Sequence, residues 1–112
     1  MIARGGFKSR RSAQFFMLTN TILTAYCACR LCCGPHAAGL CADGRKPVAG
    51  VTVAAPRAIP LGTRLQIQGF TNRFVVQDRT ARRYDGRIDI YFATHAEARR
   101  FGIRTNTVQF FK

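Results

Sequence analysis

Residues 73–92, "RFVVQDRTARRYDGRIDIYF", contain two short runs in which apolar and polar side chains alternate. Phe74 and Val76 are the apolar positions of the first run, and Ile88 and Ile90 are those of the second. A period of two is typical of half-buried β-strands. The stretch therefore predicts two strands, with a turn at Asp85-Gly86 before the second one.

Similar short runs recur on both sides of this stretch. They lie near residues 22–26 and at 51–55, 64–69 and 106–111. Turn-forming Pro60, Gly62 and Gly69 separate the central ones. Many short strands at this spacing favour a small closed barrel, because closure leaves no exposed sheet edge.

One short helix is predicted after the second quoted run. Thr94 and Glu97 form a T-x-x-E capping box, and Gly102 stands where a helix is commonly terminated by glycine. We therefore expect a mainly β fold, a small six-stranded barrel with one short helix.

Length and composition indicate a single folded domain. The chain has 112 residues, of which 47% are hydrophobic. An apolar run near the N-terminus is interrupted at residues 19–21 and is too short to span a bilayer, so no transmembrane helix is expected. We expect residues 1–20 to be a basic leader, either disordered or a degenerate export signal, and residues 21–112 to form the barrel.

The chain is strongly basic. Eighteen Lys and Arg residues, fifteen of them Arg, oppose five Asp and Glu, for a formal net charge of +13. Arginine suits carboxylate and phosphate oxygens, so the partner should be anionic. Nucleic acid and an anionic cell-wall polymer both satisfy this, and a coding bias toward arginine would explain the charge without any partner.

Four of the five cysteines are crowded into "CACRLCC", residues 27–33. Cys29 and Cys32 have the C-x-x-C spacing with which two thiolates share a metal, and Cys27 with Cys41 or His36 would complete a tetrahedral zinc site. The alternatives are disulfides, whose pairing an odd number of cysteines leaves open, and unlinked thiols.

Three of the five acidic residues fall within residues 77–89. Asp78 ends the first quoted run, and Asp89 stands in mid-strand between two isoleucines, where an acid is unfavourable unless function needs it. If the two strands are neighbours, the carboxylates approach each other. Mutual repulsion and apolar surroundings would then raise a carboxyl pKa, as a general acid requires.

An ordered set of motifs resembles a known family. "TAYC" and "ADG" are followed by "VAAPRAIPLGT", "VVQDRT", "GRIDIYF" and "HAEARRFG". Over about residues 22–111 the chain resembles the 3D domain, named for three aspartates, which forms part of membrane-bound lytic transglycosylase A and is related to the rare lipoprotein A barrel. Asp89 follows Asp78 by eleven positions, the same separation as between the two aspartates of the family's D-T-G-G-A-I-K-G-x-x-I-D pattern. The resemblance implies a double-psi β-barrel.

The resemblance also implies a reaction, cleavage of the β-1,4 bond between N-acetylmuramic acid and N-acetylglucosamine in peptidoglycan. One acid, at the position of Asp89, protonates the glycosidic oxygen and then helps the 6-hydroxyl close a 1,6-anhydro ring. Asp78 would support it. Tyr26 and Tyr84 are candidates for stacking on sugar, with core or surface roles as the alternative. Arg79 and Arg87 would either hold an acidic substrate or lower the carboxyl pKa. No cofactor is required, and zinc would be structural.

The chain departs from the family at several positions. Ala55 stands where the first aspartate is expected, and Thr80 and Ala81 replace the glycine pair after the second one. The absence of the first aspartate favours a second hypothesis, a cell-wall binding module without catalysis. A third, nucleic-acid binding, lacks a basic helix or an aromatic ribonucleoprotein motif. With a peptidoglycan partner we expect a monomer that works in the cell envelope, as a secreted protein or in a phage particle.

Overall fold

The computed structural model describes residues 15–28, 39–82 and 86–111, and its regular elements there are six strands and one helix. The strands are β1 (Phe15–Tyr26), β2 (Thr52–Ala55), β3 (Arg64–Ile67), β4 (Phe74–Arg79), β5 (Arg87–Tyr91) and β6 (Arg104–Phe111), and the helix is α2 (His95–Phe101). The expected mainly β fold with one short helix is therefore confirmed.

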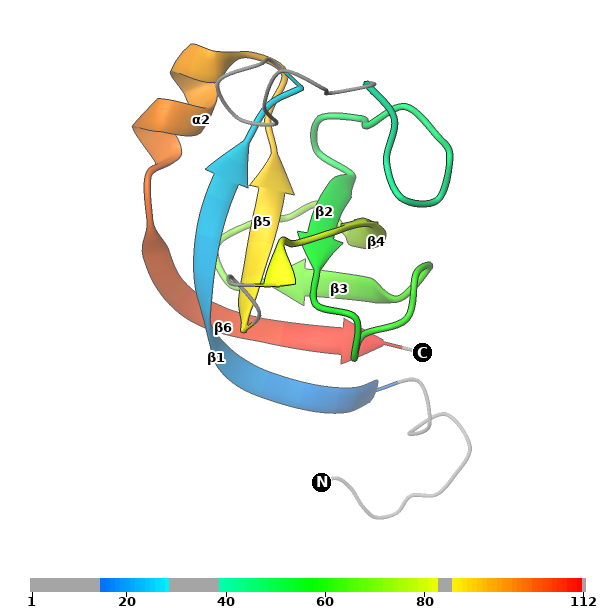
Figure 1. Ribbon diagram of the computed structural model, residues 1–112. Coiled ribbons are helices and arrows are strands. Elements are labelled where there is room, and N and C mark those ends of the chain that lie inside the picture. Colours follow the sequence, from blue (N-terminus) through cyan, green and yellow to red (C-terminus); the bar gives the residue numbers. More distant parts are fainter. Residues whose placement is uncertain (1–14, 29–38, 83–85, 112) are drawn as a thin grey trace.

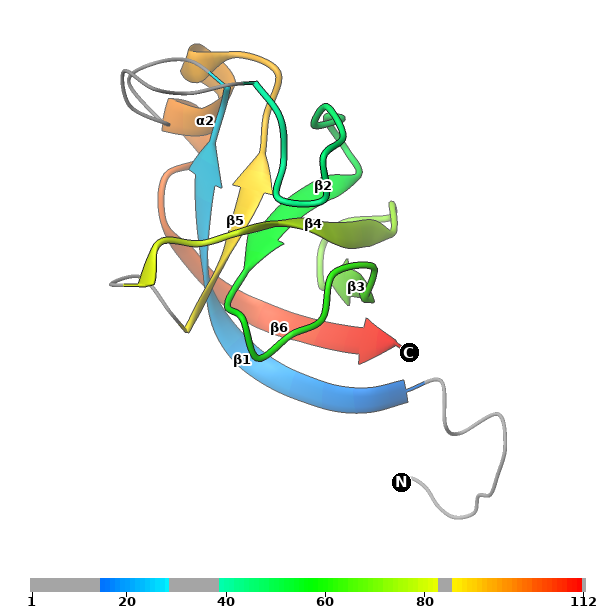
Figure 2. The same ribbon diagram turned by 45° about the vertical axis from the view of Figure 1, so that its right-hand side comes forward.

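The strands close into a barrel in the order β1-β5-β2-β4-β3-β6, with β6 paired to β1 (Figure 1). The pairs β1–β5 and β2–β4 are parallel, and the others are antiparallel. When the molecule is turned, β4 comes forward beside β2 (Figure 2). Because every strand has two neighbours, the sheet has no free edge, as predicted.

The first strand is longer than predicted. β1 begins at Phe15, six residues before the boundary expected at residue 21, and its first half pairs with β6 up to Phe111. Thr19, Asn20 and Thr21 interrupt an apolar run, but polar residues are compatible with a strand that exposes one face to solvent. Residues 15–20 are therefore part of a strand of the barrel.

The interior is filled by apolar side chains from all six strands and from α2. The buried cluster comprises Leu23, Val53, Ala55, Leu65, Ile67, Phe74, Val76, Ile88, Ile90, Phe101, Val108 and Phe110. Burying one large side chain of this kind contributes about 1.5–3 kcal/mol. All four apolar positions of the quoted stretch face this core.

α2 begins and ends as predicted. The Thr94 hydroxyl accepts a hydrogen bond from the Glu97 amide, and the Glu97 carboxylate accepts one from the Thr94 amide. Gly102 follows with a φ of 67°, a conformation that favours glycine. α2 lies at one end of the barrel beside β1 (Figure 1) and inserts Phe101 into the core.

Within the described residues, no helix has the length and apolar character needed to cross a membrane.

Candidate active site

Four side chains stand side by side across four strands. Ala54 on β2 is aligned with Asp89 on β5 and with Asp78 on β4, and Asp89 is aligned with Thr24 on β1. Residues paired in this way direct their side chains to the same face of a sheet. Because Val53, Ala55, Ile88 and Ile90 fill the core, the row Thr24, Asp89, Ala54, Asp78 lies on the outer face.

The strands of the two aspartates are not neighbours. β2 lies between β4 and β5, so the two backbones are roughly 10 Å apart, twice the spacing of adjacent strands. The condition under which the sequence brought the two carboxylates together, adjacent strands, is therefore not met. The residue between the carboxylates is Ala54, 3% exposed, whose methyl group leaves room above it for side chains from both sides.

A β-bulge in β4 turns Asp78 to this face. Val53 pairs with Val76, but the next residue, Ala54, pairs with Asp78, so Gln77 is an extra residue. In regular pairing Asp78 would stand opposite Ala55 and face the core. Gln77 accepts a hydrogen bond of 2.5 Å from the Thr52 hydroxyl, which is completely buried. The bulge is therefore held by a buried contact, and it directs a carboxylate as bulges beside functional sites commonly do.

Asp89 has the environment of a general acid. Burial raises the pKa of its carboxyl group from 3.8 to about 6, and the charge of Asp78 also raises it, while the hydrogen bond from Thr24 and the nearby Arg87 lower it. The Thr24 hydroxyl donates to Oδ1 over 3.0 Å. Oδ1 is therefore the oxygen of Asp89 that the protein holds in place.

Asp78 has a different environment, because both of its oxygens are occupied. Oδ1 accepts hydrogen bonds from the backbone amides of Ala42, at 3.0 Å, and Arg79, at 2.9 Å. Oδ2 accepts one from the Tyr26 hydroxyl at 3.2 Å. Asp78 therefore acts on Asp89 through its charge, and it ties the loop at Ala42 to the barrel.

Tyr26 is a buried support of the site. Its side chain is 9% exposed, and its ring packs edge-on against Tyr91, with 5.5 Å between ring centroids. Burial, followed by the charge of Asp78, raises the pKa of the Tyr26 hydroxyl above 10.0, so it remains a neutral donor. A covered ring cannot stack on a sugar, which assigns Tyr26 to the core alternative. Tyr84, the other predicted stacking residue, lies outside the described residues.

The two predicted substrate-binding arginines differ in their contacts. Arg79 directs Nη1 at the carbonyls of Ala55, Pro56 and Ile59, at 3.5, 3.1 and 2.6 Å. It therefore holds the loop after β2 and does not face the carboxylates. Arg87 does interact electrostatically with Asp89 and remains the arginine that belongs to the site.

Replacing Arg79 by Gln should destabilise the fold. The side chain of Gln is too short to reach all three carbonyls, and we expect the free energy of unfolding to fall by about 1–3 kcal/mol. Arg82→Gln, at an exposed position three residues later, should change it by less than about 0.5 kcal/mol. Urea titration of both variants measures the free energy of unfolding. If the two variants lose the same amount, the hydrogen bonds of Arg79 to the three carbonyls contribute nothing to stability.

The predicted zinc ligands are only partly described. Cys27 and Cys41 are buried and are not joined in a disulfide, and Cys27 Sγ lies 3.8 Å from Nδ1 of His95. Cys29 and Cys32 lie outside the described residues. Zinc and disulfides both remain predictions; within 15–28, 39–82 and 86–111, no group of three metal-ligating side chains occurs.

Two positions that distinguish this chain from the family motif are well defined. Ala55, at the place of the first aspartate, is fully buried in the core. Thr80, at the place of a glycine, is 5% exposed, and its hydroxyl is the one buried side-chain polar atom of the described residues without a hydrogen bond. A carboxylate at position 55 would meet apolar side chains here, so the site has to work without it.

Thr24 and Ala54 were not identified from the sequence. Both stand inside motifs quoted above, "TAYC" and "VAAP", and Thr24 and Tyr26 alternate in β1 so that both face the site. A scan against protein-family models and a search of curated proteins give no match to this chain.

Proposed function

We propose that this protein is a peptidoglycan lytic transglycosylase that uses Asp89 as its single acid and base. The observation that carries the proposal is the half-buried Asp89 carboxyl group, with a pKa of about 6 and one oxygen held by Thr24. Such a group retains a proton near neutral pH and can then accept one, as this reaction requires. The motif resemblance and the closed barrel support the same function.

The proposed reaction needs two proton transfers and no water. Protonated Asp89 donates from Oδ2 to the glycosidic oxygen, and the bond between this oxygen and the muramic acid C1 breaks. The Asp89 carboxylate then takes the proton of the muramic acid 6-hydroxyl, whose oxygen bonds to C1 and closes the 1,6-anhydro ring. The enzyme thereby returns to its starting state. Thr24 keeps Oδ1 in place throughout.

Asp78 fits a supporting role. Its carboxylate is fixed by three donors, and its negative charge raises the pKa of Asp89. Fixed charges near a reacting group also stabilise positive charge that develops on the sugar ring. A usual glycosidase positions a second carboxylate as nucleophile or base, whereas this proposal leaves Asp78 occupied by the protein.

The products of digestion test the proposal. Purified protein is incubated with peptidoglycan sacculi, and the soluble fragments are analysed by mass spectrometry. We expect muropeptides with 1,6-anhydro ends, each lighter by one water than a hydrolysis product. Fragments with reducing ends would indicate hydrolysis. If the protein sediments with sacculi but releases nothing, it is the cell-wall binding module that the buried Ala55 favours.

Thr24→Val should change how cleavage depends on pH. The hydrogen bond from Thr24 stabilises the charged form of Asp89, so its loss raises the carboxyl pKa further. Since cleavage begins with protonated Asp89, we expect the alkaline limb of the pH profile to move upward, by about half a pH unit. Thr105→Val, at an exposed position of β6, is the control. If Thr24→Val leaves the pH profile unchanged, the hydrogen bond from Thr24 does not influence the group that donates the proton.

A peptidoglycan substrate places the proposed activity outside the cytoplasmic membrane or in a phage particle. The excess of arginine would favour association with a wall polymer that carries carboxylates or phosphates.

A further inference from the structure

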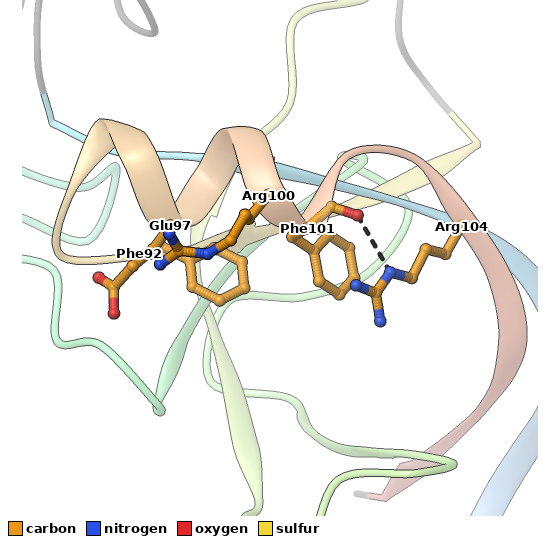
Figure 3. Close-up of a pocket in the computed structure, with 5 residues that line it drawn as sticks. All are labelled: Phe92, Glu97, Arg100, Phe101 and Arg104. Carbon is orange, nitrogen blue, oxygen red and sulfur yellow. Dashed lines mark hydrogen bonds between the residues drawn. The ribbon is translucent and has the colours of Figure 1, made fainter.

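A hollow of about 350 Å³ lies beside α2, and neither Asp78 nor Asp89 lines it. It is lined by Phe92, Glu97, Arg100, Phe101 and Arg104 (Figure 3). Its volume is at the lower end of the range for small-molecule sites. The proposed reaction uses none of these residues.

The floor of the hollow is aromatic. The rings of Phe92 and Phe101 lie 5.4 Å apart between centroids, tilted by 39°. Phe101 belongs to the core, and Phe92 packs against it. The floor is therefore rigid and suited to the aliphatic part of a ligand.

Two arginines line the hollow together with this floor. Arg104 is held in place, because its Nε donates to the Phe101 carbonyl at 3.0 Å and its Cζ lies 4.3 Å from the centroid of the Phe101 ring. Arg100 extends in front of Phe92 (Figure 3) and has no hydrogen bond or ion pair with any described residue. Both groups can still donate to an oxyanion, and Arg104 is already ordered for it.

A fixed carboxylate lies at the side of the hollow. Oε1 of Glu97 accepts hydrogen bonds from the amide and the hydroxyl of Thr94, so the helix cap holds this side chain in place. Glu97 lines the hollow together with Arg100 (Figure 3). A ligand with only negative charge leaves Glu97 without a partner, and one with only positive charge leaves both arginines without one, whereas a zwitterion matches all three.

We propose that this hollow binds a free α-amino acid group, with the carboxylate on Arg100 and Arg104, the ammonium on Glu97 and the aliphatic chain on the two phenylalanines. A diamino dicarboxylic acid in a peptidoglycan stem peptide carries such a zwitterionic end. The source of the ligand thus rests on the proposed function, whereas the binding itself does not. Exposed charge pairs are weak, so we expect a Kd on the order of 1 mM.

Titration of the full protein with free meso-diaminopimelic acid, followed by NMR at low salt, tests this. We expect the amide signals of Phe92 and of residues 100–104 to shift. Pimelic acid lacks the ammonium groups and 1,5-diaminopentane lacks the carboxylates, and both should bind at least fivefold more weakly. If the signals of the hollow stay unchanged, or if pimelic acid binds equally well, the proposal is wrong.

Variants assign the groups. Arg100→Gln and Arg104→Gln should each weaken diaminopimelic acid at least fivefold, while Arg82→Gln, which lies outside the hollow, should not. Glu97→Gln keeps a capping-box residue but removes the charge, so it should abolish the preference for diaminopimelic acid over pimelic acid. If Arg82→Gln weakens the binding of diaminopimelic acid equally, the effect comes from the overall charge of the protein, and the proposal is wrong. The titration contains no sacculi and does not depend on cleavage. A failure of this binding proposal can therefore be told apart from a failure of the proposed enzyme activity.

Discussion

Asp89→Asn should abolish cleavage of sacculi and at the same time stabilise the protein at pH 7.5. Asn accepts the hydrogen bond from Thr24 but cannot donate and retrieve a proton, so we expect cleavage to fall by about a hundredfold to ten-thousandfold. The stability gain has a separate cause. Burial disfavours the charged carboxylate, which raises the pKa of Asp89 to about 6, and Asn removes that cost.

The sign of the effect follows from proton binding. Between pH 3.8 and about 6 the folded protein keeps the Asp89 proton while the unfolded chain releases it, so this group makes the wild type less stable as the pH rises through that window. The variant does not titrate there. We therefore expect no difference below pH 4 and a gain of about 1–2 kcal/mol above pH 6.5, allowing for partial solvation.

Urea unfolding at a series of pH values measures the gain, and Asp43→Asn is the matched control. Asp43 caps a turn through the amide of Arg45, and loss of its charge from a strongly basic chain should give no gain. If Asp89→Asn is less stable than the wild type at pH 7.5, the carboxylate is a structural ion. Retained cleavage would refute its role as the acid.

Asp78→Ala should lower the free energy of unfolding by about 2–4 kcal/mol. The substitution removes the acceptor of the Tyr26 hydroxyl, which is buried and costs about 1–3 kcal/mol when unsatisfied, and that of the Ala42 amide, which is exposed and costs less. Asp78→Asn should cost much less, because its Oδ1 accepts from both amides and its Nδ2 can donate to the Tyr26 oxygen. The comparison of Ala with Asn separates hydrogen bonding from charge.

A double-mutant cycle with Tyr26→Phe tests the contact further. Tyr26→Phe alone should cost about 1 kcal/mol and should preserve the packing on Tyr91. Combined with Asp78→Ala it should add little, since the bond is already lost. Strict additivity in urea titrations would mean that the two side chains do not interact. Faster proteolysis near Ala42 in Asp78→Ala would show that the loop has been released.

Local patterns predicted the local structure well. The cap of α2 depends on Thr94, Glu97 and Gly102, which are close in sequence, and alternation located the strands because each strand buries one face. The start of β1 was missed because the partner of Phe15 is Phe111, and no local pattern reports such a pairing.

The site depends on strand order, which short motifs do not encode. Asp78 and Asp89 were recognised as chemically unusual, but the placement of Ala54 between them follows from the insertion of β2 between β4 and β5. The bulge at Gln77 and the contacts of Arg79 with the carbonyls after β2 are likewise long-range features. Residue chemistry thus pointed to both aspartates, and the assembled barrel shows how the surroundings of Asp89, the proposed proton donor, differ from those of Asp78.

The pairing of β1 with β6 also has a consequence for biosynthesis. Both neighbours of β1 come late in the chain, since β5 begins at Arg87 and β6 at Arg104. The barrel therefore cannot close until β6 has been synthesised, and the nascent chain carries an unpaired, largely apolar first strand until then. A chaperone that shields β1 during elongation should raise the yield of native protein.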